Sequence, residues 1–432
     1  MDQSIATQIK PFSSEWWDVF LKENEKFSKT KVFKNVISTE DIALLNKEII
    51  KILQELYTLK TNKYGFRVYL GGKEQDNDFM KDLFENHAPF DNENITAYFE
   101  RVFSNEKFGL IINHTEKFSE DLAHKVLLKI QPLLDKVGIP LTGLSAHILI
   151  GNYGWTPLGI HQDTRGENVI HFHLGPGPKI MYNWEEEKYK ELTGKKENNK
   201  DIEPLLPFAN EYAFETGDLY YMPWNKYHIG FSDQFSVGLT IWFNNPTKKN
   251  FTTAVMESIN TQYINDDQEI LSPNKDTDID LTFDHIKSVI NLSENLQNMT
   301  FMELLKHLHK EFKLAILSNG GWASIPMTLH DKIKYDIDNY EILENKKIIT
   351  PYPFKTYYEK FEEELIVFAR GYKVKIKYHK ELEVIIDKLN QNKEEEVNEL
   401  LRTLTQDWPI EAGLYFLSLL YDKRAINIIE NN

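Results

Sequence analysis

The chain has 432 residues, of which 41% are hydrophobic and 13% aromatic, and it carries a formal charge of -16 at pH 7 without a cysteine. This length predicts two to four folding units, and the apolar content is sufficient to build their cores. The absence of cysteine excludes disulfides, iron–sulfur clusters and thiolate zinc sites, and the acidic charge argues against general nucleic-acid binding.

No stretch of the sequence is long and apolar enough for a membrane span, which needs about 18 consecutive apolar residues. The first residues also lack the basic and then apolar layout of a secretory signal. We therefore expect a cytoplasmic protein without a membrane partner, whose charge leaves a cationic peptide or protein as a suitable partner.

Residues 1–105 are expected to form a mainly helical N-terminal part that packs on the core. Within residues 40–59, apolar side chains recur every three or four positions, at Ile42, Leu45, Ile49, Leu53 and Leu56. This spacing predicts a helix with one apolar face. Residues 117–137 show a second helical pattern, in which Pro132 marks an interruption or a boundary.

From residue 106 to residue 250 the pattern changes to short β-branched and aromatic runs separated by Gly and Pro. The runs "NVIHFHLG" (168–175) and "FSVGLTIWFN" (235–244) are typical of strands joined by turns. We therefore expect a β-rich barrel here, in a chain of the α+β class.

The remaining sequence predicts two further regions. Residues 251–345 are expected to be helical, with helices at 284–296 and 302–318 that make a homodimer a reasonable expectation. Residues 346–432 contain an extended, lysine-alternating run followed by helical patterns at 381–389, 395–404 and 412–420. This region predicts either a winged-helix-like module or a helical element for dimerisation or docking.

The segment "GIHQDTRGENVIHFHLGPGPK" (159–179) contains the strongest candidate for a metal site. His161 and Asp163 are two residues apart, so on a strand they project from the same face and can bind one ion. A second imidazole would complete a 2-His-1-carboxylate triad, which suits non-haem Fe(II). His228 follows the turn and strand "GDLYYMP", and an antiparallel barrel can bring it to the His161–Asp163 edge.

The other histidines of this part of the chain have a structural interpretation. His171 and His173 share one face of a different strand, and we expect them to line the barrel with satisfied hydrogen bonds. His114, His124 and His147 lie in ordinary helix or strand contexts, so we also expect them to be structural.

Four motifs in order carry a resemblance to a known family: "HQD" (161–163), "GPGPKIMYNW" (175–184), "GDLYYMPWNKYH" (217–228) and "VGLTIWFN" (237–244). Together they resemble the JmjC or cupin-like branch of the Fe(II)/2-oxoglutarate oxygenases, particularly the protein hydroxylases, over residues 156–244. The resemblance implies a double-stranded β-helix, also called a jelly roll or cupin fold. It also implies that His161, Asp163 and His228 are the catalytic iron ligands.

The resemblance further implies residues that bind the co-substrate 2-oxoglutarate. Lys179 corresponds to a lysine that pairs with its distal carboxylate, Asn244 to an asparagine near it, and Thr156 to a threonine before the His-x-Asp motif. The residues themselves favour Lys179 as well, because no arginine follows His228 before residue 370 to serve as an alternative anchor. Lys248 and Lys249 are weaker rivals in an expected loop.

The predicted function is hydroxylation of a side chain in a peptide or protein, with release of succinate and CO2. Residues that flank the motifs are candidates for shaping the substrate cleft: Tyr153, Trp155, Arg165, Tyr182 and Trp184. Demethylation of an N-methyl group uses the same chemistry and stays open. So do a metal-dependent cupin that acts as an isomerase, lyase or small-molecule binding module without 2-oxoglutarate, and an interaction protein with a purely structural barrel.

Overall fold

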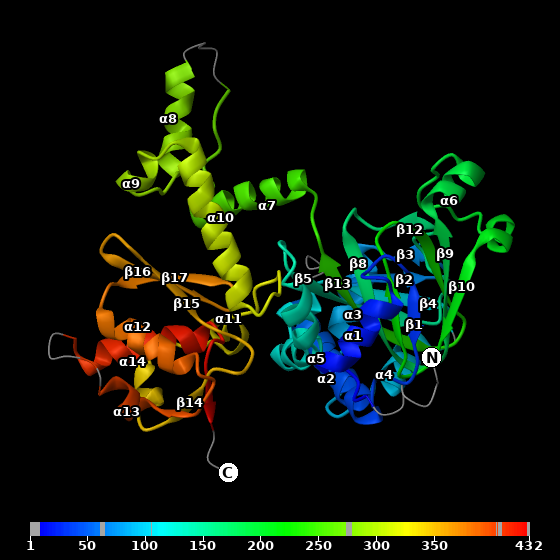
Figure 1. Cartoon of the computed structure of the whole chain (residues 1–432), viewed down its shortest axis with the longest axis horizontal. Helices are drawn as coiled ribbons and strands as arrows, with labels where there is room; N and C mark the ends of the chain where they lie inside the picture. Colours follow the sequence, from blue (N-terminus) through cyan, green and yellow to red (C-terminus); the bar gives the residue numbers. More distant parts are fainter. Residues whose placement is uncertain are drawn as a thin grey trace.

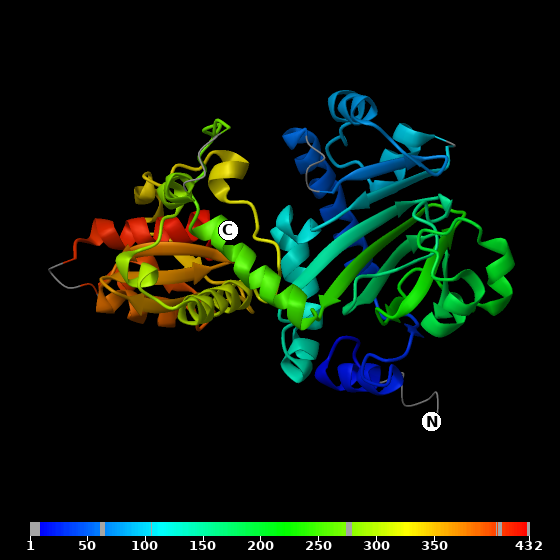
Figure 2. The same cartoon turned by 90° about the horizontal axis from the view of Figure 1, so that it is seen from above.

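The computed structural model describes residues 9–60, 65–104, 106–273, 279–402, 404 and 408–429. Figure 1 shows two parts, a barrel with its N-terminal helices and a smaller C-terminal module. Helix α7 (Lys248–Gln262) leads from the barrel toward α10 (Phe301–Ser318), which packs on the module's sheet. Figure 2 shows the two parts side by side, with α7 between them.

Eight strands form the barrel: β5 (Leu144–Gly151), β7 (His161–Gln162), β8 (Glu167–Pro176), β9 (Lys179–Glu185), β10 (Asn210–Phe214), β11 (Leu219–Met222), β12 (Lys226–Ser232) and β13 (Ser236–Asn244). They form two antiparallel sheets, one with the order β11-β8-β13-β5 and the other with the order β10-β9-β12-β7. Successive strands cross from one sheet to the other, except that β9 and β10 pair within the smaller sheet. This arrangement defines a double-stranded β-helix. The predicted α+β class with a jelly-roll core is therefore confirmed.

Further strands extend both sheets beyond this core. On the larger sheet β1 (Lys31–Phe33) lies beside β11, and β4 (Phe108–Ile112), β2 (Arg67–Leu70) and β3 (Lys73–Glu74) follow β5. The short β6 (Gly154–Trp155) pairs with β12 in the smaller sheet. The N-terminal part thus lengthens the wall of the barrel with strands that the helical sequence pattern does not predict.

The main core lies between the larger sheet and the N-terminal helices α1 (Ser14–Glu23), α2 (Thr39–Leu59), α3 (Asn77–Asn86), α4 (Ile95–Phe103) and α5 (Glu120–Val137). Helix α2 has the predicted position, and it buries Leu45, Ile49 and Leu53 as the spacing predicts. Pro132 does not interrupt the second predicted helix, because α5 continues past it to Val137. Proline leaves the carbonyl of Leu128 without its helical donor, but this residue is 42% exposed and water can replace the donor.

The C-terminal module has its own hydrophobic core and two three-stranded sheets. The sheets comprise β14 (Lys347–Ile349), β15 (Tyr357–Phe361), β16 (Glu364–Ala369), β17 (Tyr372–Lys377), β18 (Glu395–Glu396) and β19 (Asn427–Ile429). They pack with α12 (Lys380–Leu389), α13 (Val397–Leu401) and α14 (Ile410–Asp422). The predicted helix at 395–404 is wrong at its start, because residues 395 and 396 pair with β14 as a strand. The domain boundaries and the winged-helix-like form stay predictions.

The predicted helix at 284–296 is divided in the structure. Helix α8 (Ile279–Val289) ends where Ile290 bridges to Ile264, and α9 (Glu294–Gln297) begins after Ser293 caps it. In the described part of the chain, none of the helices has the length and apolar character that crossing a membrane requires.

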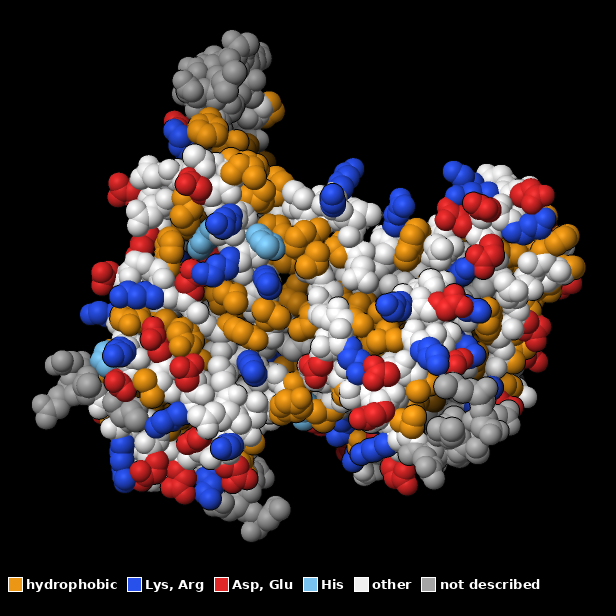
Figure 3. Space-filling model, viewed as in Figure 1, with side chains coloured by type: hydrophobic (Ala, Val, Ile, Leu, Met, Phe, Trp, Pro, Cys, Tyr) orange, Lys and Arg blue, Asp and Glu red, His pale blue; other side chains and the backbone are white. Residues whose placement is uncertain are grey.

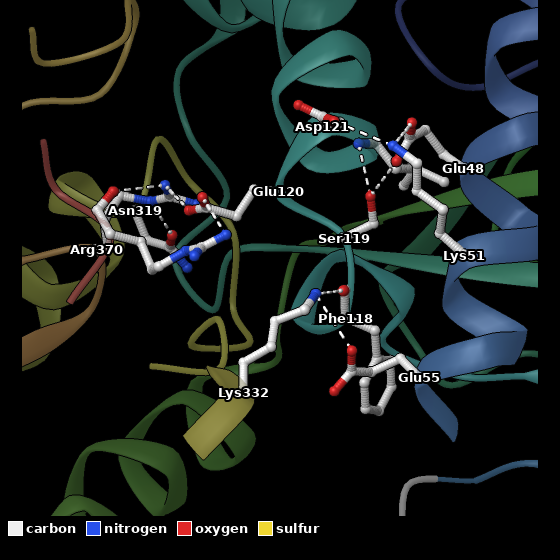
Figure 4. A network of polar contacts seen from close by, with 12 residues as sticks. Glu48, Lys51, Glu55, Phe118, Ser119, Glu120, Asp121, Asn319, Lys332 and Arg370 are labelled. Atoms are coloured by element: carbon white, nitrogen blue, oxygen red, sulfur yellow. Dashed lines mark hydrogen bonds and ion pairs between the residues drawn. The ribbon is translucent and has the colours of Figure 1, made fainter. Parts of the chain in front are cut away.

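Charged residues hold the module against the barrel part (Figure 4). Glu120, the first residue of α5, accepts a hydrogen bond from Arg370 Nη1 at 2.7 Å and forms an ion pair with Arg424, whose Nη2 lies 2.8 Å from Oε2. Arg370 is only 3% exposed and also donates to Asn319 Oδ1. Lys332, on α11 (Leu329–Ile333), donates to the carbonyl of Phe118 in the same interface. The two parts are therefore joined through buried ion pairs as well as through the chain.

Candidate metal centre and its cavity

His161 and His228 are brought together by the pairing of two strands. Strand β7 pairs with β12 so that His228 lies directly opposite His161, and the ring centroids are 4.4 Å apart. Directly opposed residues of an antiparallel pair project from the same face of the sheet. The register of this pair therefore places both imidazoles at one position on the barrel wall.

Asp163 completes the cluster from the loop that follows β7. Its Oδ1 atom lies 3.9 Å from His161 Nε2 and 3.9 Å from His228 Nε2. The three ligand atoms all lie within 4.8 Å of one another, and in the described part of the chain this is the one cluster of its kind. The residues that the sequence predicts as ligands thus converge, and their metal-binding role stays a prediction.

Backbone hydrogen bonds orient both rings. The Nδ1 atom of His161 lies 2.9 Å from the carbonyl of Gly159, and that of His228 lies 3.2 Å from the carbonyl of Lys226. Because a carbonyl only accepts, each Nδ1 carries a proton, and in the neutral ring Nε2 turns its lone pair toward Asp163. Burial lowers the pKa of His228 to about 4, so this ring is neutral at pH 7. Two imidazoles and one carboxylate form a donor set that fits Fe(II).

The cluster opens into a cavity of about 380 Å³ between the two barrel sheets. One wall carries a polar row across four strands of the larger sheet, in which His147 lies opposite Thr240, Thr240 opposite His171, and His171 opposite Tyr220. All four residues line the cavity. The site is therefore a pocket with hydrogen-bonding groups on the wall that faces the metal cluster.

Lys179 contributes a buried cation to this cavity. The residue is 5% exposed, and no described residue forms an ion pair or hydrogen bond with its ammonium group. Its Cε lies 3.2 Å from the place that a Cβ on Gly230 would occupy, so the side chain passes over a residue without a side chain. Gly230 is two residues, or about 6.7 Å of strand, from His228. A buried lysine without a partner is costly, so this position favours an anionic ligand.

The other two predicted co-substrate residues differ in their placement. Thr156 lines the cavity, and its hydroxyl bonds to both the N–H and the carbonyl of Gly230. Asn244, at the end of β13, is not among the lining residues, and its amide nitrogen lies 3.4 Å from Ser145 Oγ. Trp242, two residues earlier on the same strand, lines the cavity in this region. The roles of Thr156 and Asn244 stay predictions.

The expectation that His171 and His173 have satisfied hydrogen bonds is wrong for half of their nitrogens. His171 Nδ1 pairs with Thr240 Oγ1 at 2.8 Å and His173 Nε2 donates to the carbonyl of Gly177 at 2.8 Å. The other nitrogen of each ring is buried without a partner among the described residues. For His171 this nitrogen belongs to a ring that lines the cavity, beside Lys179. A side chain that faces the cavity has fewer protein partners than one in a packed core, and a bound ligand can supply the missing hydrogen bond.

Residues flanking the motifs take several positions. Tyr153 lies under Lys179, with 5.8 Å from its ring centroid to Nζ. Trp155 packs on Tyr182, and both pack against the core cluster that contains the fully buried Trp184. Arg165 lies over the ring of Trp224 and lines a neighbouring cavity. None of these five predicted cleft residues lines the metal cavity.

Arg67 lines the cavity and was missed by the sequence analysis. It lies on β2, which precedes the barrel in the chain by many residues and joins its sheet through β4. Its surroundings in the sequence carry no motif, so only the pairing of distant strands could have identified it.

No family model matches the chain, and no curated protein is similar to it. Among solved structures, it resembles YcfD, a ribosomal oxygenase from Escherichia coli, in complex with cobalt and 2-oxoglutarate. The two share 15% identity over 95% of this chain and 98% of that chain, with a TM-score of 0.48. A complex of YcfD with cobalt and succinic acid gives 15% identity over the same shares and a TM-score of 0.45.

A further similar structure is the non-haem α-ketoglutarate-dependent carbocyclase SnoK from nogalamycin biosynthesis. It has 12% identity, covers 56% of this chain and 93% of its own, and gives a TM-score of 0.33. The chemistry rests on the residues of the site itself.

Proposed function

We propose that the protein is an Fe(II)- and 2-oxoglutarate-dependent oxygenase that hydroxylates a side chain of a peptide or protein. The observation that carries the proposal is the convergence of His161, Asp163 and His228 in a cavity that also contains an unpaired, buried Lys179. A 2-His-1-carboxylate set leaves metal positions open for a chelating 2-oxo acid and for dioxygen. Bound Fe(II) with 2-oxoglutarate supplies the oxidising chemistry, which releases succinate and CO2.

The chain's own residues prepare this site for the metal. Backbone carbonyls accept from Nδ1 of His161 and of His228, so in each neutral ring Nε2 is the nitrogen that is available to a cation. Asp163 supplies the negative charge between them. The arrangement therefore needs little reorganisation when the ion enters.

Lys179 is proposed to hold the distal carboxylate of 2-oxoglutarate through a charge-assisted hydrogen bond. The ligand would provide the partner that the ammonium group lacks among the described residues. His171 is proposed as a second donor to the same carboxylate. If the Thr240 hydroxyl donates to its Nδ1, the proton lies on the unpartnered Nε2.

Apolar side chains complete the cavity and limit the access of water. Leu149, Val169, Met181 and Met222 lie on its walls, together with Trp242. Exclusion of water strengthens the electrostatic contacts of Lys179 and protects the oxidising chemistry from side reactions. A polypeptide substrate fits the large N-terminal and C-terminal parts that surround the barrel, because they offer more surface than a small molecule requires.

Anaerobic addition of Fe(II) and 2-oxoglutarate tests the proposal through the visible metal-to-ligand charge-transfer band of the chelate. We expect the band in the wild-type protein and its loss in His228→Ala. His285→Ala is the matched control, because it removes an exposed histidine on α8. Absence of the band in the wild-type protein would falsify the proposal and favour a cupin that works without 2-oxoglutarate.

We also propose that the helical region formed by α8 and the start of α10 pairs with the same region of a second copy of the chain. Exposed apolar residues gather along α8 and the start of α10 (Figure 3), among them Phe283, Ile286, Phe301 and Met302. Exposed apolar clusters of this kind often mark protein–protein contacts. Light scattering should give the mass of a dimer for the wild-type protein and of a monomer for Met302→Glu combined with Phe301→Glu. A wild-type monomer contradicts this part of the proposal.

A further inference from the structure

Arg67 reaches the metal cavity from outside the barrel proper. It lies opposite Ile111 on β4, and Ile111 lies opposite Leu149 on β5. Directly opposed residues share a face of the sheet, and all three line the cavity. The strands added by the N-terminal part therefore lengthen the cavity wall and place a guanidinium group on it.

This guanidinium has no anionic partner. No described residue forms an ion pair with Arg67, and its Nε is buried without a hydrogen-bond partner. The two carboxylates that line the cavity, Asp163 and Glu167, both come from the metal end. The nearest polar side chain on the same face of β2 is Tyr69, which lies within hydrogen-bond reach of Arg67 and donates its hydroxyl proton to Glu74 on β3. Arg67 thus has a neutral neighbour but no carboxylate, and a partly buried arginine without an anionic partner gains from an incoming anion.

Arg67 and Lys179 enter the cavity from different sheets. Lys179 begins β9 of the smaller sheet, and its side chain crosses Gly230, two residues from His228. Arg67 lies on β2 of the larger sheet, in the row that continues through Ile111 and Leu149. The two cations therefore belong to different walls of the cavity.

The wall beside Arg67 is neutral, and its polar groups are hydrogen-bonded to one another. His147 is uncharged at pH 7, its Nδ1 lies 3.0 Å from Asn113 Oδ1, and its ring packs on Trp242 at 4.0 Å between centroids. These hydrogen bonds occupy the polar atoms of His147 with neighbours rather than with Arg67. Among the described lining residues, the guanidinium is thus the one charged group that strands β2, β4 and β5 contribute to the cavity.

We propose that Arg67 binds a carboxylate of the polypeptide substrate, supplied by an acidic side chain or by the end of the chain, beside the residue that reacts. This inference rests on the proposed function and names a substrate feature. The fork of a guanidinium suits bidentate binding of a carboxylate. With a net charge of -16 the protein repels acidic partners at long range, so a local cation in the cavity is needed to select one.

The test uses three small probes with the protein loaded with Mn(II) and 2-oxoglutarate. N-acetylaspartyl amide carries the side-chain carboxylate, N-acetylalanine carries the terminal one, and N-acetylasparaginyl amide is the neutral isostere. Paramagnetic relaxation of the acetyl protons reports binding near the metal. We expect at least fivefold greater relaxation of one carboxylate probe than of the neutral one, and the stronger probe identifies the source.

In Arg67→Gln this difference should disappear while the affinity for 2-oxoglutarate stays within about twofold. Arg67→Lys should keep part of it, and Lys73→Gln, which removes an exposed cation from the adjacent β3, should keep all of it. Equal relaxation by charged and neutral probes in the wild-type protein overturns the inference. So does a large loss of 2-oxoglutarate affinity in Arg67→Gln, because Arg67 would then hold the co-substrate.

Failure of the proposed function gives a different result. If the site does not bind the metal, Mn(II) does not enhance the relaxation of water through the protein, whatever the probes do. Saturation transfer from protein protons to the same three probes then still tests Arg67. A preference for a carboxylate probe that depends on Arg67 supports the anion site, and no preference overturns it.

Discussion

The side chain of Lys179 crosses over Gly230 on the neighbouring strand, where a Cβ atom would lie 3.2 Å from the lysine Cε. The same Cβ would lie 3.0 Å from Met181 Sδ and 3.0 Å from Thr156 Oγ1. Residue 230 is therefore the point at which the proposed co-substrate site is most crowded. This relationship connects the backbone of the metal-bearing strand with the position of the cation.

Gly230→Ala should displace the lysine by a few tenths of an ångström and weaken 2-oxoglutarate binding about fivefold, or roughly 1 kcal/mol. Metal binding should change little, because the ligands do not contact the new methyl group. Titration of the charge-transfer band measures the first quantity, and Mn(II) binding measures the second. An unchanged affinity for 2-oxoglutarate contradicts the proposed position of its distal carboxylate.

Lys179→Met should weaken 2-oxoglutarate binding by about 10- to 100-fold, the range expected for loss of a hydrogen bond to a charged group. Binding of 2-oxopentanoate, which lacks the distal carboxylate, should stay the same. Lys249→Met, at an exposed position on α7, is the control. An equal loss for both 2-oxo acids would mean that the substitution disturbs the metal site rather than the carboxylate contact.

His171→Phe keeps a ring of similar size but removes the unpartnered Nε2. We expect 2-oxoglutarate to bind about 5- to 10-fold more weakly, with no change for 2-oxopentanoate. A purely structural role for His171 predicts equal effects on the two compounds. The comparison therefore separates a ligand contact from a packing defect.

The stability of the metal-free protein should fall as the pH drops below about 6.5. Burial lowers the pKa of His147 to about 3 and that of His173 to about 4. Between these values and the ordinary histidine pKa, both side chains are protonated in the unfolded chain and neutral in the folded chain. At pH 5 each of these two histidines should lower the free energy of unfolding by about 2 kcal/mol relative to pH 7, and the loss grows until the pH reaches the pKa of the folded state.

Urea unfolding of the metal-free protein at pH 7 and pH 5 measures this loss. His173→Gln should have a smaller loss than the wild-type protein, whereas His309→Gln, at an exposed position on α10, should match it. Carboxylates titrate equally in all three proteins, so the comparison isolates the histidine. Identical pH dependence in His173→Gln and wild type would contradict the assignment.

Glu120→Ala should lower the stability of the contact between the barrel part and the module by about 3 kcal/mol, because it leaves the buried Arg370 without its carboxylate. Arg424 loses its ion pair at the same time. Thermal unfolding should show a lower first transition, and limited proteolysis should cut faster between the two parts. Glu187→Ala, at an exposed position on α6 (Glu186–Thr193), should have no effect.

Sequence patterns predicted the barrel well because the order of apolar and polar residues within a strand reflects which of its faces are buried. Alternating and β-branched runs marked β8 and β13, and the ordered motifs placed His161, Asp163 and His228 in one site. Local sequence patterns did not predict elements whose structure depends on residues far away in the chain. It missed β2, which becomes part of the barrel sheet only by pairing with β4.

The sequence by itself determined which residue types were available for chemistry, their spacing along each strand and the absence of thiol ligands. Tertiary structure alone decided that His161 faces His228, that Arg67 lines the cavity and that Asn244 does not. The physical reason is that side-chain alternation is a property of one strand, whereas register is a property of two. A shift of one residue in the pairing of β7 with β12 would turn the opposed side chains to opposite faces and separate the ligands.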